Sequence, residues 1–188
     1  MPTRARDRLL DTAERLFYAN GIRSVGVERI LAESGVGRAS LYRHFPGKDD
    51  LVVAVLQRRD QAWRQWLREA VERLAPAPAD RPLAVFDALA ERFARDDFRG
   101  CAFINTIVET ADPQSMAHLV ADKHKRAVIA YVDGLLTGAG HEGHGPLAAQ
   151  LVMLMDGAIV TALRERTPNA AKLARSTAAG LLSVSRDR

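Results

Sequence analysis

The sequence has little of several features that mark particular classes of protein. It contains one cysteine, Cys101, among 188 residues, which excludes an internal disulfide and any fold built on a disulfide framework. Apolar and polar residues nowhere alternate over a stretch long enough for a sheet. The longest weakly charged run, 146–163, carries Asp156 near its middle, where a membrane-spanning helix would bring a charge into hydrocarbon at high cost. We therefore expect a soluble, cytoplasmic protein without a membrane segment.

The positive charge of the chain is concentrated at its N-terminal end. Residues 1–48 hold nine basic and five acidic residues, whereas the remaining residues hold eighteen of each. The whole formal excess of +4 therefore lies in the first quarter of the sequence, where an attraction to a polyanion would be concentrated. Asp7, Asp11 and Glu14 interrupt this basic segment, so it lacks the apolar stretch of a secretory signal.

Apolar residues recur at three- and four-residue intervals along most of the chain, which predicts an all-α fold. Three short helices are expected to form a compact N-terminal head. The first should end at Asn20-Gly21, the second at Gly35 and the third at Pro46-Gly47. A fourth helix, from Lys48 to about Leu74, lacks Gly and Pro and would span roughly 40 Å. Beyond a proline-rich linker at 75–82, further helical segments are expected at 83–95, 101–110, 113–137, 147–166 and 168–184.

Residues 27–45 have the form helix, glycine-centred turn, helix, which places a second helix in the major groove of DNA. Leu41 and Phe45 lie one turn apart and are predicted to face inward, with Val36 between the two helices. The outer surface of the second helix then carries Arg38, Ser40, Tyr42, Arg43 and His44. These side chains match phosphate oxygens and base edges, although a solvated face of a small helical cap would have a similar pattern.

This stretch resembles the tetracycline-repressor (TetR) family of bacterial transcriptional regulators. The resemblance covers about residues 8–55 and rests on Ala13-Glu14-Arg15-Leu16-Phe17, Asn20-Gly21, Ile30, Gly35-Val36 and the run from Leu41 to Leu51. It implies a homodimer with a DNA-binding domain at 1–47. It also implies an all-α domain at 48–188 that binds a small molecule and dimerises through its last two long helices.

By position, the resemblance implies that Arg38 and Ser40 approach bases or nearby phosphates. It also implies that Tyr42, His44 and Lys48 bind phosphates. Arg43 is included in the predicted DNA-binding surface, and so is Gly37, which stands where the family usually has a hydroxyl residue and therefore lacks that side-chain contact.

Apolar and aromatic residues in the predicted C-terminal domain are consistent either with an effector pocket or with plain core. The candidates for ligand binding are Trp63, Trp66, Phe86, Phe103, Met116, His124 and Tyr131. Cys101 is more typical of an inert core residue than of an oxidant sensor. Asp156 is a carboxylate in an otherwise apolar helix and therefore needs a polar or charged partner. No cofactor or metal is predicted, because His141-Glu142-Gly143-His144 lacks the spacing of a zinc-protease helix.

The last two helices each carry a seam of small and apolar residues that we expect at a four-helix dimer interface or in intrachain packing. The seams are Leu147, Leu151, Leu154, Ala158 and Ala162, and Leu173, Thr177, Gly180 and Leu181. The predicted function is a repressor that a small apolar effector releases from a pseudo-palindromic operator. The alternatives are a DNA-binding regulator or architectural protein without an effector and, more remotely, an all-α enzyme using Cys101 with His124.

Overall fold

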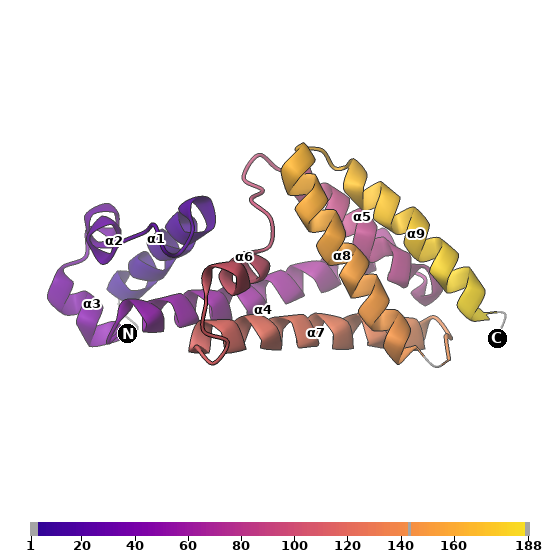
Figure 1. The fold of residues 1–188 in the computed structure, drawn as a ribbon, viewed down its shortest axis with the longest axis horizontal. Helices are drawn as coiled ribbons and strands as arrows, with labels where there is room; N and C mark the ends of the chain where they lie inside the picture. The colour runs from indigo at the N-terminus through magenta and orange to yellow at the C-terminus, as the bar shows by residue number, and fades with distance from the viewer. Residues whose placement is uncertain (1–3, 143, 187–188) are drawn as a thin grey trace. The chain divides into compact units, whose positions relative to one another are not determined.

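The computed structural model describes residues 4–142 and 144–186, and every regular element in these two ranges is helical (Figure 1). The all-α prediction is therefore confirmed. The elements are α1 Arg4–Asn20, α2 Val27–Ser34, α3 Arg38–His44, α4 Lys48–Leu74, the 3₁₀ turn η1 Pro78–Asp80, α5 Arg81–Phe93, α6 Ala102–Glu109, α7 Met116–Gly138, α8 Gly145–Glu165 and α9 Asn169–Arg186.

Two predicted boundaries are wrong for local reasons. The proline-rich linker at 75–82 contains η1 and the first residues of α5, because Pro82 lies in the first helical turn, where its missing N–H costs nothing. Helix α7 begins at Met116 rather than Pro113, because Asp112 Oδ1 accepts a hydrogen bond of 2.8 Å from the Gln114 backbone N–H and holds a turn there.

The described residues divide into two compact units. Unit 1 comprises the residues up to Gln61 together with Ala102–His124, and unit 2 comprises Ala62–Cys101 and the residues from Lys125 onward. These units describe packing. The division into a DNA-binding domain at 1–47 and an effector and dimerisation domain at 48–188 is a functional prediction.

In unit 1, α1 packs against α2 and α3 and closes a small apolar core. Leu41 and Phe45 are buried as predicted, and Val36 is buried between the two helices of the motif. Gly35 ends α2 in the left-handed region, with φ of +61°, and its N–H donates to the Leu31 carbonyl at 3.0 Å. The turn between α2 and α3 therefore has the form that the sequence predicts.

Arg8 fixes this turn from α1. Its guanidinium donates to the Ser34 carbonyl at 2.7 and 3.0 Å and to the Gly35 carbonyl at 2.6 Å. Carbonyl groups at a helix C-terminus lack intrahelical partners and favour a cation. Arg8 thus holds the C-terminal end of α2 against α1 and sets the direction in which α3 leaves.

The core of unit 2 is formed mainly by α5, α8 and α9, which pack against one another (Figure 1). Phe86 is completely buried in this core. The predicted α8 seam is buried in the same core apart from the partly buried Leu154, so intrachain packing, the alternative to a dimer interface, applies to this seam. Among the described side chains of α8 and α9, the large apolar ones that remain exposed are Met153, Val160, Leu163 and Leu173.

Within the described ranges, α8 is the one helix long and apolar enough to cross a membrane by length and composition. Its buried face belongs to the core of unit 2, and Asp156 forms an ion pair with Lys125 of α7. The partner that the sequence requires for Asp156 is therefore a lysine of the same unit. These are features of a core helix.

Candidate nucleic-acid interface

The outer face of α3 carries the side chains that the sequence assigns to DNA. Arg38, Tyr42 and Arg43 are exposed, while Ser40 and His44 are partly buried. Tyr42 keeps 45% of its surface exposed although it is a large aromatic residue, because Leu41 and Phe45, which directly follows α3, occupy the inner side instead. The outer face of α3 therefore presents two guanidinium groups and a phenol.

Arg38 forms an ion pair with Glu28 of α2, and this hydrogen-bonded carboxylate raises the pKa of Arg38 above its ordinary value. Both side chains are largely exposed. A phosphate or a base edge would have to replace Glu28 as the partner of this guanidinium. Within the described part of the chain, Arg43 forms no hydrogen bond or ion pair and needs no such exchange.

The exchange at Arg38 leads to a prediction for Glu28→Gln. Loss of the carboxylate frees Arg38 and removes a negative charge beside the proposed interface, so we expect DNA affinity to rise about two- to fivefold, as for an exposed ion pair. Fluorescence anisotropy with labelled duplex DNA measures this change. The matched control is Glu91→Gln, which breaks the exposed pair with Arg73 in unit 2 and should leave affinity unaltered. A lower affinity for Glu28→Gln would contradict the proposed role of Arg38.

Lys48, at the start of α4, donates a hydrogen bond of 2.6 Å from Nζ to the Ile22 carbonyl. An ammonium group has three donors, so this contact leaves two for a phosphate. The structure therefore gives Lys48 a second task that the sequence does not reveal, which is to hold the loop between α1 and α2 against α4.

Several other cations of the N-terminal segment have internal partners. Arg15 and Arg29 both pair with Glu33, at 2.6 and 2.9 Å, and these guanidinium groups hold the pKa of Glu33 below its usual range. Arg8 is used on the α2 carbonyls, and Arg6 lies over the Phe45 ring at 5.5 Å. The charge count alone therefore overstates how many basic groups are available to DNA.

The seven predicted ligand-binding residues fall in both units. In unit 1, the His124 ring stacks on Phe103 at 3.6 Å, while Met116 is exposed. His124 Nδ1 lies 2.7 Å from Asp60 Oδ1, and because a carboxylate only accepts hydrogen bonds, this nitrogen carries the proton.

In unit 2, Phe86 is core, and the rings of Trp63 and Trp66 lie 5.9 Å apart. Trp63 and Tyr131 line a small pocket together with Arg64 and Arg68. Burial, assisted by the charge of Glu72, raises the pKa of Tyr131 to about 12, so its hydroxyl remains a hydrogen-bond donor at neutral pH.

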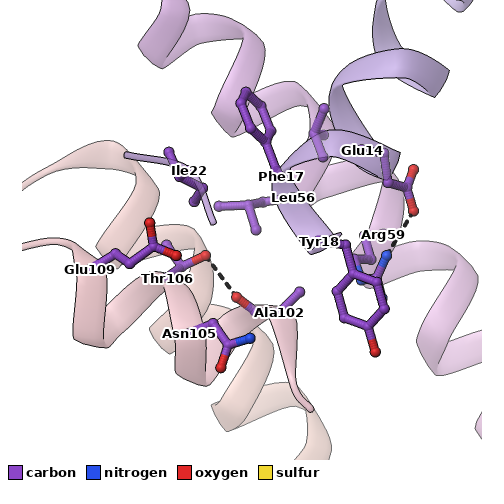
Figure 2. Close-up of a pocket in the computed structure, with 11 residues that line it drawn as sticks. Glu14, Phe17, Tyr18, Ile22, Leu56, Arg59, Ala102, Asn105, Thr106 and Glu109 are labelled. Atoms are coloured by element: carbon purple, nitrogen blue, oxygen red, sulfur yellow. Dashed lines mark hydrogen bonds and ion pairs between the residues drawn. The ribbon is translucent and has the colours of Figure 1, made fainter. Parts of the chain in front are cut away.

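A further pocket lies in unit 1 between α1, α4 and α6 (Figure 2). The sequence does not reveal this pocket, because its walls come from three helices that are far apart along the chain and show only ordinary amphipathic patterns. Among the described residues, no group of three or more His, Cys, Asp or Glu side chains is placed to hold a metal ion. Gly143 of the His141–His144 segment lies outside the described residues.

The helices α1, α2 and α3 form a compact unit with a glycine-centred turn, and α3 turns a basic face outward. This arrangement defines a helix-turn-helix DNA-binding protein. Residues 9–55 match the family model described as bacterial regulatory proteins, tetR family. The crystal structure of SCO4454, a TetR-family transcriptional regulator from Streptomyces coelicolor, is 37% identical, with a TM-score of 0.89, and the match covers 98% of this chain and 91% of that one.

Two further matches involve one relative. The HTH-type transcriptional repressor NemR of Escherichia coli is 29% identical over 140 residues, which is 74% of this chain and 70% of the relative. The crystal structure of NemR in its reduced form has a TM-score of 0.83 at 26% identity and covers 94% of this chain and 95% of that one.

The chain belongs to the TetR family of bacterial transcriptional regulators and is a DNA-binding transcriptional regulator. Its relatives are transcriptional regulators rather than enzymes. Regulators of this family bind DNA operators and small-molecule effectors and are dimeric.

Proposed function

We propose that the protein is a cytoplasmic repressor that binds a pseudo-palindromic operator as a homodimer and leaves it when a small apolar effector binds. The observation that carries this proposal is the outer face of α3, where Arg38, Tyr42 and Arg43 project from a helix anchored by Leu41 and Phe45. NemR, a relative by sequence and by fold, is a transcriptional repressor.

In this proposal, residues 1–47 form the DNA-binding domain and 48–188 the effector and dimerisation domain. Arg38, Ser40 and Arg43 contact base edges or adjacent phosphates, and the backbone of Gly37 allows the close approach of α3. Tyr42, His44 and Lys48 bind phosphate oxygens on either side of the major groove. The support for these roles is the exposure of α3 and the unused donors of Lys48.

Dimerisation through α8 and α9 is supported by the apolar side chains that these helices leave exposed. Met153, Val160 and Leu173 keep 73%, 53% and 70% of their surface exposed, although they are large and apolar. Gly157 and Gly180 are also exposed and have open space around them, so another helix could approach closely. A two-fold interface here would give two DNA-binding domains for two half-sites.

Catalysis by Cys101 with His124 receives no support from the surroundings of the histidine. Its ring is buried and stacked on Phe103, and its Nδ1 proton is directed to Asp60. We therefore assign His124 a packing role and propose that the protein is not an enzyme.

An effector can release DNA only by the difference between its affinities for the two conformations of the protein. The experiment titrates small apolar metabolites into the preformed protein–DNA complex and follows anisotropy, with melting temperatures recorded in parallel. We expect at least one compound to raise the melting temperature and weaken DNA binding. Compounds that do neither across a broad library would favour a regulator without an effector.

A further inference from the structure

The pocket of unit 1 has an apolar interior and a polar rim. Phe17 from α1, Val55 and Leu56 from α4, and Ala102 from α6 supply apolar surface. Figure 2 shows Asn105, Thr106 and Glu109 of α6 on one side, opposite Tyr18, Glu14 and Arg59. A ligand in this position would touch the first helix of the DNA-binding domain and α6 together.

The charges on the Arg59 side of the pocket compensate one another. Glu14 Oε1 accepts a hydrogen bond of 3.1 Å from Arg59, and Glu14 Oε2 accepts one of 2.7 Å from Arg58. The Arg59 guanidinium also lies 3.9 Å from the centre of the Tyr18 ring. Neither Glu14 nor Arg59 therefore offers an unsatisfied charge to a ligand.

Glu109 differs from Glu14, because its carboxylate has no cationic partner in residues 4–142 and 144–186. It accepts one hydrogen bond, of 2.9 Å, from the Arg23 backbone N–H to Oε2. Glu109 is only partly exposed, on a wall that is otherwise largely apolar. A partly buried carboxylate whose single hydrogen-bond donor is neutral can still form a charge-assisted hydrogen bond with a cation.

The same carboxylate packs closely on the loop between α1 and α2. A Cβ atom at Gly21 would lie 3.1 and 3.2 Å from the two Glu109 oxygens, and Gly21 has a φ of +86°. Only glycine fits this approach without strain. Glu109 therefore connects the pocket directly to the segment that leads into α2.

We infer that this pocket is an effector site for a small apolar amine. The ammonium group pairs with Glu109, and the hydrocarbon part covers Phe17, Val55 and Leu56. The amine replaces the Arg23 N–H as a partner of the carboxylate, and it also contacts Ile22, whose carbonyl Lys48 holds. Both contacts that fix the loop between α1 and α2 are then disturbed, so the conformation that holds the amine binds DNA less well.

The consequence for DNA rests on the proposed function, whereas occupation of the pocket does not. Thermodynamic linkage requires that the amine lowers the affinity for DNA by the same factor by which DNA lowers the affinity for the amine. The ligand site and its regulatory effect are therefore measured separately.

The test uses the full-length chain and 2-phenylethylamine as the probe, with 2-phenylethanol and phenylacetate as neutral and anionic controls. Calorimetric titration and melting temperature measure binding in the absence of DNA. We expect binding of the amine, with the alcohol about 10- to 100-fold weaker because it lacks a charge-assisted hydrogen bond, and no measurable binding of phenylacetate.

Two variants locate the site. Glu109→Gln keeps an oxygen that accepts from the Arg23 N–H but removes the charge, so it should fold normally and bind the amine about 10- to 100-fold more weakly. Ala102→Leu places extra side-chain atoms in the pocket and should weaken binding of the amine and of the alcohol to the same extent. Asp7→Asn removes one exposed negative charge of α1 outside the pocket and should bind the amine as the unmodified protein does.

Equal binding of the amine and the alcohol, unaltered binding by Glu109→Gln, or no binding of the amine would overturn the assignment of the site. Glu109-dependent binding without any loss of DNA affinity would overturn the regulatory effect. If the chain binds the amine through Glu109 but binds no DNA, the site stands and the proposed function fails.

Discussion

Replacing Arg38 and Arg43 together by alanine is expected to weaken binding to operator DNA by about 100-fold or more at fixed salt. The two guanidinium groups are the exposed cations of α3, and together they supply both charge and fork-shaped hydrogen bonding. If each also neutralises one phosphate, the slope of log affinity against log salt falls by about 2 per protomer. Anisotropy titrations at several salt concentrations measure both quantities.

A suitable control for this variant is the pair Arg73→Ala and Arg95→Ala, which removes two exposed guanidinium groups from unit 2. Its affinity and salt slope should match those of the unmodified protein. Circular dichroism should show that both double variants keep their helix content, because all four side chains are exposed. An Arg38/Arg43 variant with full affinity would show that α3 does not enter the groove.

The double substitution Met153→Glu and Leu173→Glu is expected to convert the dimer into monomers and to lower operator affinity by at least about 100-fold. The two positions are 73% and 70% exposed in the single chain, so the charges should disturb its fold little. In a two-fold interface each charge would be buried without a partner. A single DNA-binding domain would also lose the gain in effective concentration that comes from linking two of them.

Sedimentation equilibrium measures the dissociation of the dimer, and anisotropy measures the loss on DNA. The control is Val108→Glu, which places a charge at an apolar position of α6 that is 79% exposed. This variant should sediment with the same mass as the unmodified dimer. If the Met153/Leu173 variant remained fully dimeric at micromolar concentration, the interface would lie elsewhere.

The sequence predicts the DNA-binding motif and α4 well, because their boundaries depend on neighbouring residues. Gly35 adopts the left-handed conformation that ends α2, and Lys48–Leu74 is helical over the predicted length. Leu41 and Phe45 face inward as their one-turn spacing requires. Signals of this kind act within a few residues, and a single sequence contains all of them.

The inward face of α8 cannot be predicted in the same way. Leu151 and Met155 are buried while Met153 and Val160 are exposed, yet all four are apolar. A helix that is apolar on several sides has no polar stripe to mark solvent, so periodicity does not choose between core and interface. This is why the predicted seam on α8 lies in the core.

Contacts between distant segments are equally hidden. Arg8, Lys48 and Glu109 look like ordinary surface charges in the sequence, but they bind backbone groups of Ser34, Ile22 and Arg23. Backbone groups are the same at every residue, so no pairing of side-chain types reveals these bonds. The sequence does not reveal the pocket of unit 1 either, since the pocket exists only where α6 meets α1 and α4.

Selection of bound duplexes from a random pool with the purified protein tests most directly whether the exposed face of α3 binds DNA in a sequence-dependent way. Sequencing after several rounds should give a two-fold symmetric site whose half-sites are about 34–36 Å apart, or a multiple of this distance. Substitution of Arg38 or Arg43 should then relax the preference at particular bases. A pool that remains random after selection at low salt would contradict the account.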